Sequence, residues 1–289
     1  MSTTSVYKTS EGERAVMAFY DSVLKRWPVP YETLNIATRH GDTFVIASGQ
    51  PSAPPLVLLH GAGSNSAVWA RDIVAYSHSY RTYAIDLLGE AGHSAENRPD
   101  WTSPAYAEWL DDVLNALKVE KAVLIGMSQG AWVALKYTTA KPERIEKLAL
   151  ISPGGVIPDR ASFVFRALYY SLSGRWGAKR MVRMLYADQP ISEGVGEMTT
   201  VLIRNFRARM GILPIFSDEQ LQRLTMPTLL LGGTKDALRD IDKIAARLRM
   251  FVPQLDVVIL PGAGHAVVNT AEHILPFLSP EEAIADLNK

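Results

Sequence analysis

The sequence predicts an α/β fold with a mostly parallel sheet flanked by helices. Six short apolar runs are typical of strands buried on both faces, and helical stretches separate most of them. Two alternating segments precede these runs and bring the expected sheet to eight strands. A long interval without buried strands predicts a helical insertion, and an amphipathic stretch near the start predicts an extra N-terminal helix.

The first predicted element is a helix over residues 11–27, where apolar side chains recur at the spacing of one helix face. Pro28 and Pro30 end it, and we expect it to pack on the core as an N-terminal extension. Segments 34–38 and 43–47 then alternate as in a β-hairpin, with Gly41 and Asp42 in the connecting turn.

The buried strands follow the hairpin. Their apolar runs are LVLLH at 56–60, YAID at 83–86, AVLIG at 122–126, LALIS at 148–152, TLLLGG at 228–233 and VVILP at 257–261. The clearest helices between them span 101–117 and 131–140. Alternating strands and helices imply βαβ units with right-handed crossovers.

The interval between Ser152 and Met226 contains three amphipathic, arginine-rich stretches, at 163–173, 178–186 and 195–209. It is too long for a simple loop. We therefore expect a core made of residues 1–153 and 226–289, with a helical cap at 154–225 that covers one edge of the sheet.

Composition narrows the class of protein. The chain has 289 residues, 47% of them hydrophobic, and a formal net charge of zero. This balance argues against nucleic acid or an anionic membrane as partner, unless a local patch exists. The absence of cysteine excludes disulfides, thiolate nucleophiles and cysteine-bound metals. No signal peptide or membrane span is evident, so we expect a cytoplasmic protein; its oligomeric state stays open.

The strongest chemical signal is Gly126-Met-Ser128-Gln-Gly130, which follows the run AVLI and precedes a good helix. Ser128 would therefore lie on a sharp strand-to-helix turn, where only small neighbours fit. The positive end of the helix dipole would point at the reacting centre. A chance match to this pattern is common, but the strand before it and the helix after it favour a nucleophile.

A serine hydroxyl needs a base, and His265 is the candidate. It lies in Pro-Gly-Ala-Gly-His, directly after the last predicted strand, at the carboxyl edge of the sheet. The other histidines fit less well, because His40 and His78 lie far upstream in polar surroundings, His273 is on an expected surface helix, and His93 is better explained as a loop brace.

The base needs an acid that holds its tautomer, and chain order places this acid between the serine and the histidine. Asp236 follows the run TLLLGG and meets this condition. Asp240 is its closest rival, although helix N-capping explains it better. Asp256 lies at the start of a predicted strand, whereas the acid is expected on a loop after the end of a strand.

Acyl transfer also needs donors for an oxyanion. We expect one from the backbone N–H of Gln129, directly after the nucleophile. The other should come from the loop His60-Gly-Ala62-Gly-Ser64, and the N–H of Ala62 is the best candidate. A plain glycine-rich turn would look the same, so this assignment depends on its position relative to Ser128.

These motifs, together with the segment Asp86-Leu-Leu-Gly-Glu-Ala-Gly-His-Ser94, resemble the α/β-hydrolase fold family. The resemblance spans residue 30 to the C-terminus. The whole chain, including WPVPYE at 27–32, is similar to the small carboxylesterases of Bacillus-type bacteria. Serine at the elbow disfavours the family members that displace halide or open epoxides, because these use aspartate there.

The resemblance implies a serine hydrolase that cleaves carboxylic esters through an acyl-enzyme intermediate, without a metal or organic cofactor. Ser128, His265 and Asp236 would form the triad, and the partner would be a small-molecule ester. A lactonase, an amidase or a carbon–carbon bond hydrolase could use the same triad, and a slow ligand sensor could keep the same fold. The pocket would decide, and we expect cap aromatics to line it or to pack between cap helices: Phe163, Phe165, Tyr169, Tyr170, Trp176 and Phe206.

Overall fold

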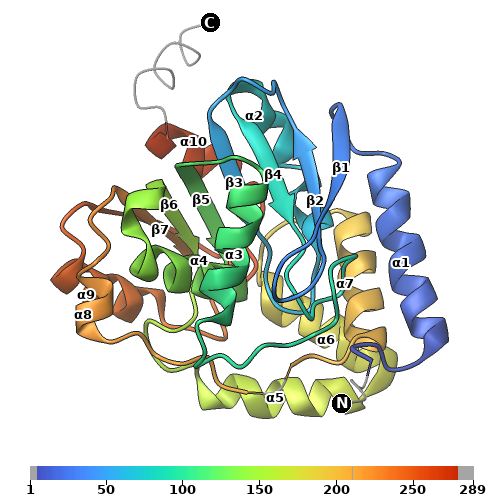
Figure 1. Cartoon of the computed structure of the whole chain (residues 1–289). Coiled ribbons are helices and arrows are strands. Elements are labelled where there is room, and N and C mark those ends of the chain that lie inside the picture. Colours follow the sequence, from blue (N-terminus) through green and yellow to red (C-terminus); the bar gives the residue numbers. More distant parts are fainter. Residues whose placement is uncertain (1–4, 210, 279–289) are drawn as a thin grey trace, which may run out of the picture.

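The computed structural model describes residues 5–209 and 211–278. Within these residues an eight-stranded sheet runs through the centre, in the order β1-β2-β4-β3-β5-β6-β7-β8 (Figure 1). β2 is antiparallel to both of its neighbours, and all other pairs are parallel. The strands are β1 (Tyr31–Ile36), β2 (Thr43–Ser48), β3 (Pro55–Leu59), β4 (Arg81–Ile85), β5 (Ala122–Met127), β6 (Ile145–Ile151), β7 (Thr228–Gly233) and β8 (Leu255–Leu260). The predicted sheet is confirmed.

Helices cover both faces of the sheet (Figure 1). One face packs against α3 (Ala105–Ala116), α4 (Gln129–Ala140) and α9 (Ile241–Phe251). The other packs against α2 (Ile73–Ser79), α10 (Ala271–Leu278) and part of α1 (Ser10–Leu24). The short 3₁₀ turn η1 (Ser66–Ala70) packs in this layer, whereas η2 (Pro142–Arg144) directly follows α4 and contacts it.

The strand side chains alternate between the two faces. In β3, Leu56 and Leu58 belong to one hydrophobic cluster, and Val57 and Leu59 belong to the other. All four are fully buried, and burying each such side chain contributes about 1.5–3 kcal/mol. A continuous apolar run is therefore what this central strand requires.

Among the described residues between β6 and β7 there are four helices. They are α5 (Ala161–Leu172), α6 (Gly174–Tyr186), α7 (Glu193–Asn205) and the short α8 (Asp218–Leu221). We name α5, α6 and α7 the cap helices. They match the three stretches predicted as helical, each to within a few residues. The proposed division into a core and a cap at 154–225 stays a prediction, and residues 1–4, 210 and 279–289 of that division lie outside the described residues.

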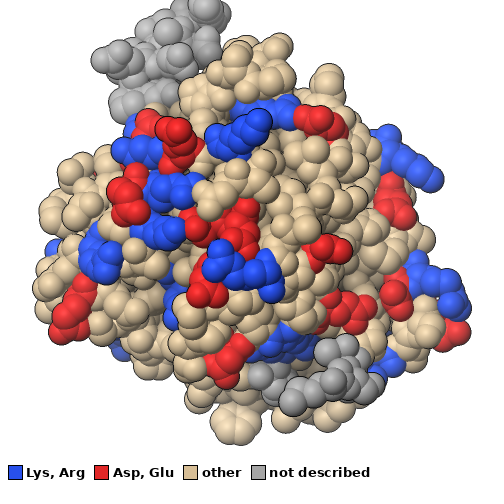
Figure 2. Space-filling model, in the orientation of Figure 1, with Lys and Arg blue, Asp and Glu red and all other residues tan. Residues whose placement is uncertain are grey.

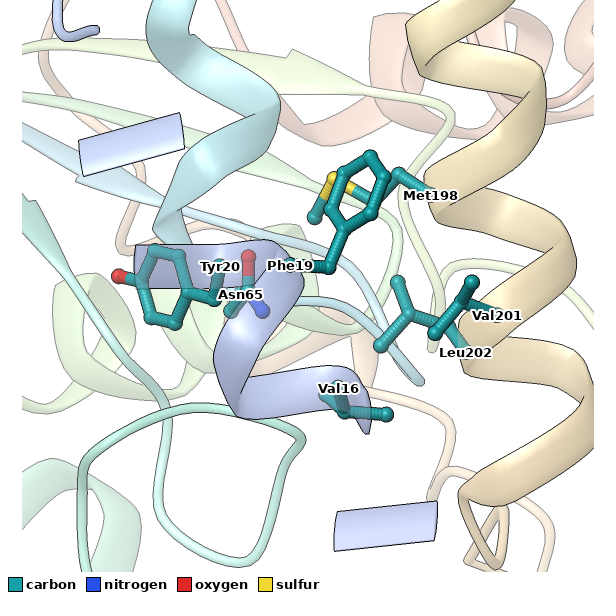
Figure 3. Close-up of a pocket in the computed structure, with 7 residues that line it drawn as sticks. All are labelled: Val16, Phe19, Tyr20, Asn65, Met198, Val201 and Leu202. Atoms are coloured by element: carbon teal, nitrogen blue, oxygen red, sulfur yellow. The ribbon is translucent and has the colours of Figure 1, made fainter. Parts of the chain in front are cut away.

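The N-terminal helix does more than extend the core. α1 begins at Ser10, where the hydroxyl of Thr9 accepts a hydrogen bond from the N–H of Gly12 at 2.9 Å. One side of α1 packs against α7, and Figure 3 shows Phe19 beside Met198 at this contact. Tyr20 points away from α7 in the same view. We expected α1 to pack on the core, and it contacts a cap helix as well.

The hairpin is present with a longer connection than a tight turn. β1 and β2 pair from Tyr31 opposite Ser48 to Ile36 opposite Thr43. Residues 37–42 connect them, and the N–H of Gly41 donates to the carbonyl of Thr38 at 3.1 Å. Among the described residues, no helix is long and apolar enough to cross a membrane.

Candidate active site

Ser128 lies on the turn between β5 and α4 in a strained backbone conformation, with φ of 53° and ψ of −107°. The turn leaves no room for larger neighbours. A Cβ on Gly126 would lie 2.6 Å from the Cα of Ala131, and a Cβ on Gly130 would lie 2.3 Å from the carbonyl oxygen of Leu59. The two glycines of the motif are therefore required by close backbone packing.

The structure brings the three predicted side chains into one hydrogen-bonded chain. Nε2 of His265 lies 2.9 Å from Oγ of Ser128, and Nδ1 of His265 lies 2.9 Å from Oδ2 of Asp236. All three residues are buried, with exposed fractions of 8% for Ser128, 6% for His265 and 2% for Asp236. This is the geometry in which a histidine can take a proton from a serine hydroxyl while a carboxylate holds its tautomer.

The loop after β7 orients Asp236. Its Oδ1 accepts hydrogen bonds from the N–H groups of Leu238 at 2.7 Å and Arg239 at 2.9 Å, which leaves Oδ2 for His265. Burial by itself would raise the pKa of the Asp236 carboxyl, but His265 and the two backbone donors outweigh burial and lower this pKa. The carboxylate is thus kept charged beside the imidazole.

The end of α6 holds the loop that carries His265. The N–H of Ala266 donates to the carbonyl of Leu185 at 2.9 Å. The side chain of Gln189 donates to the carbonyl of Ala266 at 2.8 Å and accepts from the N–H of Val268 at 3.0 Å. The cap helices therefore position the candidate base, a contribution that the sequence did not indicate.

The two predicted oxyanion donors lie on segments that meet at Ser128. A Cβ on Gly61, next to Ala62, would be 3.5 Å from the Cβ of Ser128, so this loop lies against the serine. Gln129 is the first residue of α4, where backbone N–H groups have no partner within the helix. Within the described part of the chain, the N–H groups of Ala62 and Gln129 have no acceptor.

Sequence reasoning missed Glu90, which joins these two segments. Its Oε2 accepts from the N–H of Gly63 at 2.6 Å, and its Oε1 accepts from the side-chain amide of Gln129 at 2.8 Å. The carboxyl is buried, and burial raises its pKa to about 7. The sequence feature that could have indicated this role is a glutamate inside the glycine-rich segment 86–94.

Arg239 was also missed, although it lies three residues after Asp236. Its Nη1 donates to Oγ of Ser128 at 3.1 Å and to the carbonyl of Ser152 at 2.7 Å, and its Nε pairs with Asp159 at 2.7 Å. The side chain is only 3% exposed. Nothing in the local sequence pattern indicated that this arginine points at the serine, because α9 begins at Ile241 and the turn before it is irregular.

The rival residues have structural partners elsewhere. Asp240 caps the start of α9 by accepting from the N–H of Lys243, and it pairs with Arg160 at 3.2 Å. His93 contacts Asp21 at 3.0 Å and stacks on Tyr20, which agrees with a brace between a loop and α1.

The remaining rivals also have other positions. His40 contacts Glu108 at 2.8 Å. Asp256 and His78 are exposed, and His273 lies on α10. Among the described residues, no cluster of three or more His, Asp or Glu side chains could hold a metal ion.

Three of the six predicted pocket aromatics are exposed to solvent. Phe165, Tyr169 and Trp176 are 73%, 61% and 50% exposed. Phe206 is buried, and its ring would lie 3.7 Å from a Cβ on Gly63, so this aromatic side chain does pack beside the oxyanion loop. The other expectation, packing between cap helices, holds for Tyr169 on α5 and Trp176 on α6, whose ring centroids lie 6.2 Å apart, and Tyr170 on α5 also contacts Trp176 at 5.8 Å.

Comparison with known proteins defines the class. A family described as the alpha/beta hydrolase family matches residues 56–287, and the chain belongs to this family. Over 286 residues it is 31% identical to an uncharacterized carboxylesterase, nap, of Bacillus subtilis (strain 168), covering 92% of this chain and 93% of that protein. Carboxylesterase YbfK of the same strain is 31% identical over 256 residues, covering 85% and 86%.

Solved structures agree with this placement. The crystal structure of naproxen esterase (carboxylesterase NP) from Bacillus subtilis is 30% identical, with a TM-score of 0.85 over 94% of this chain and 99% of that one. Carboxylesterase CesB (YbfK) from Bacillus subtilis gives 29% identity and a TM-score of 0.83, over 93% and 99%. The resemblance inferred from the motifs is confirmed.

Proposed function

We propose that this α/β hydrolase is a carboxylesterase that uses Ser128 as its nucleophile. The observation that carries the proposal is the chain of two hydrogen bonds, each 2.9 Å long, from Ser128 through His265 to Asp236. The carboxylesterases from Bacillus subtilis support the bond type, because they align with nearly the whole chain. The substrate would be a small-molecule ester.

In acylation, Oγ of Ser128 attacks the ester carbonyl while Nε2 of His265 takes the hydroxyl proton. Asp236 stabilises the imidazolium through Nδ1. The carbonyl oxygen becomes an oxyanion that accepts hydrogen bonds from the N–H groups of Ala62 and Gln129. His265 then returns the proton to the alcohol oxygen, the carbon–oxygen bond breaks, and the alcohol leaves.

In deacylation, His265 takes a proton from water, and the resulting hydroxide attacks the acyl-enzyme. The second tetrahedral intermediate collapses to release the carboxylic acid and to restore the Ser128 hydroxyl. Each step uses groups of this chain and water, so the scheme calls for no metal or organic cofactor. A cytoplasmic location remains a prediction.

The test is hydrolysis of p-nitrophenyl esters of increasing acyl length by the wild type and by Ser128→Ala. We expect rapid turnover of short esters by the wild type and a loss of at least about 10⁴-fold in kcat for the variant. A fluorophosphonate probe, which labels serine nucleophiles, should add its mass to the wild type and not to Ser128→Ala.

Ser152→Ala is the matched control. Ser152 is also buried at the end of a neighbouring strand, and its hydroxyl has no partner among the described residues. This control should keep its turnover. Substantial hydrolysis by Ser128→Ala would disprove the nucleophile assignment, and an inert wild type across the whole ester series would direct the search to lactones, carbon–carbon bonds or a sensing role.

A further inference from the structure

The outer side of α5 presents apolar side chains to solvent. Val164, Phe165, Leu168, Tyr169 and Leu172 are between 50% and 80% exposed, and Trp176 at the start of α6 is 50% exposed. We name these six residues the apolar stripe. α5 contains no buried residue and lies at the outer edge of the molecule (Figure 1).

The stripe has the spacing of one helix face, because its members on α5 are separated by one, three and four positions. A surface helix normally turns such a face toward the core, whereas this one turns it outward. Single exposed apolar residues are ordinary, but a contiguous group with aromatic members marks an interaction surface.

Five exposed cations lie on the same two helices as the apolar stripe. Arg166 lies on α5, and Arg175, Lys179, Arg180 and Arg183 lie on α6, all of them exposed. None of the five forms an ion pair with a described residue. The guanidinium of Arg180 lies 5.2 Å from the centre of the Trp176 ring, so charge and apolar surface are adjacent.

The formal net charge of zero for the whole chain does not show that this region is basic. Residues 160–187 contain six Lys and Arg and no Asp or Glu. On the face shown in Figure 2, basic and acidic side chains are interspersed. Asp159 and Asp188 flank this region, and they pair with Arg239 and Lys235, which lie outside it.

We propose that α5 and the first half of α6 form a docking surface for anionic lipid. Exposed Phe, Tyr, Trp and Leu side chains would insert at the boundary between headgroups and acyl chains, while the unpaired cations contact the phosphates. Charge complementarity selects a negatively charged bilayer over a neutral one. The helix would lie in the interface and would not span it.

The docking surface is tied to the candidate site. At the start of α5, the N–H of Arg160 donates to the carbonyl of Leu238 at 2.9 Å, and its Nη1 donates to the carbonyl of Asp236 at 3.0 Å. When α5 binds lipid, the loop that carries Asp236 would therefore lie next to the helix that contacts the lipid surface. The proposal does not depend on which bond that site cleaves.

The experiment is vesicle flotation of the purified full chain at low ionic strength. Vesicles of phosphatidylcholine alone are compared with vesicles that contain one quarter phosphatidylglycerol. We expect binding to the anionic vesicles only, with loss of binding at high salt because the headgroup attraction is screened. Turnover of a soluble short ester, measured in parallel, reports on the active site separately.

Two variants and two matched controls locate the surface. Phe165→Ser/Leu172→Ser removes two apolar contacts, and Arg175→Glu/Lys179→Glu reverses two charges. Met250→Ser and Arg249→Glu make the same kinds of change at exposed positions on α9. The charge variant should lose vesicle affinity by at least about 25-fold. The apolar variant should also bind less, the controls should bind like the wild type, and all should keep short-ester turnover.

Three outcomes would overturn the proposal. In the first, the wild type does not float with anionic vesicles. In the second, the α9 controls lose as much binding as the α5 and α6 variants. In the third, the wild type ignores vesicles but sediments as a dimer that Phe165→Ser/Leu172→Ser dissociates. That last result would assign the apolar stripe to contact between two copies of this chain.

Discussion

At the scale of single residues, two buried side chains support the site of the proposed nucleophile without belonging to the triad. Glu90 accepts from the two segments that carry the proposed oxyanion donors, and Arg239 donates to Oγ of Ser128. Both are ionisable groups held out of solvent, where a lost partner is costly. Each leads to a prediction that separates a catalytic effect from a purely structural one.

Glu90→Gln should lower kcat for a short ester by about tenfold with little change in KM. The amide keeps one acceptor oxygen, but its NH₂ group faces the second donor, so one of the two segments loses its support. Steady-state kinetics checks this. Glu96→Gln is the control, because Glu96 also accepts a backbone N–H, from Val6 at 3.0 Å. An unchanged kcat in Glu90→Gln would remove Glu90 from the positioning role.

The same variant should change how stability depends on pH. The pKa of Glu90 is raised by burial from 4.5 to about 7 in the folded chain. Between these values the folded state keeps a proton that the unfolded state releases, so the wild type loses stability as pH rises from 4.5 to 7. The loss is about 3 kcal/mol relative to Glu90→Gln. Denaturant titrations at both ends of this window measure it, and parallel curves would refute it.

Arg239→Met should lower kcat by about tenfold, because a cation beside Oγ stabilises the negative charge that develops there. It should also destabilise the fold by about 3 kcal/mol, since Asp159 loses its partner. Arg239→Met/Asp159→Asn removes both charges and should recover the unfolding midpoint without recovering kcat. Recovery of both quantities in the double variant would show that the arginine acts only through stability.

At the scale of elements, the elbow between β5 and α4 depends on backbone contact. Gly130→Ala would place a Cβ 2.3 Å from the carbonyl oxygen of Leu59 and 2.4 Å from that of His60. We expect a loss of about 3 kcal/mol in the free energy of unfolding, because neither backbone group can yield cheaply. Turnover should fall as well, since the displaced loop carries Ala62.

Gly194→Ala on α7 is the control for this prediction. A Cβ there meets nothing within 4 Å, and the position is helical. The substitution should stabilise the protein by about 0.5 kcal/mol. Thermal and denaturant unfolding of the two variants give the comparison. Equal effects at Gly130 and Gly194 would contradict the close packing of the elbow.

The end of α6 and the residues just after it support the loop that carries His265. The carbonyl of Leu185, in the last turn of α6, and the side chain of Gln189, three residues after this helix ends, hold the backbone beside His265. The loop after β8 could adopt other conformations by itself, because it contains Gly262 and Gly264. The position of the candidate base is therefore decided by an element from a distant part of the chain.

At the scale of the whole molecule, α1 connects the core with the cap. One side of α1 packs on α7, and another side places the hydroxyl of Tyr20 3.0 Å from Oδ1 of Asp86. Asp86 also accepts from the N–H groups of Ser66 and His93, both at 2.8 Å. One buried carboxylate thus joins α1, η1 and the loop after β4.

Tyr20→Phe should lower the free energy of unfolding by about 2 kcal/mol, because it removes a hydrogen bond to a buried carboxyl group without creating a large cavity. Tyr31→Phe is the control. Tyr31 is 39% exposed, and its hydroxyl has no hydrogen bond to a described residue, so we expect a change within about 0.5 kcal/mol. Urea unfolding measures both. No difference between the two variants would show that α1 is only loosely attached.

The sequence by itself determined the strands, most helices and the three residues of the proposed triad. Buried parallel strands require continuous apolar runs, and the turn at Ser128 requires glycines at 126 and 130, so these features are written in local residue types. Chain order and the ends of predicted strands then selected His265 and Asp236. The rest of the site depends on contacts between residues that are far apart in the chain.

Only the tertiary structure decided the roles of Glu90 and Arg239, the support of the His265 loop by α6, and the outward direction of the apolar stripe. A glutamate in a glycine-rich segment reads the same whether its carboxyl faces water or two backbone segments. A helix with apolar spacing likewise reads the same whether that face is buried or exposed. Local pattern specifies periodicity and turns, whereas the partner of each face is set by how the whole chain packs.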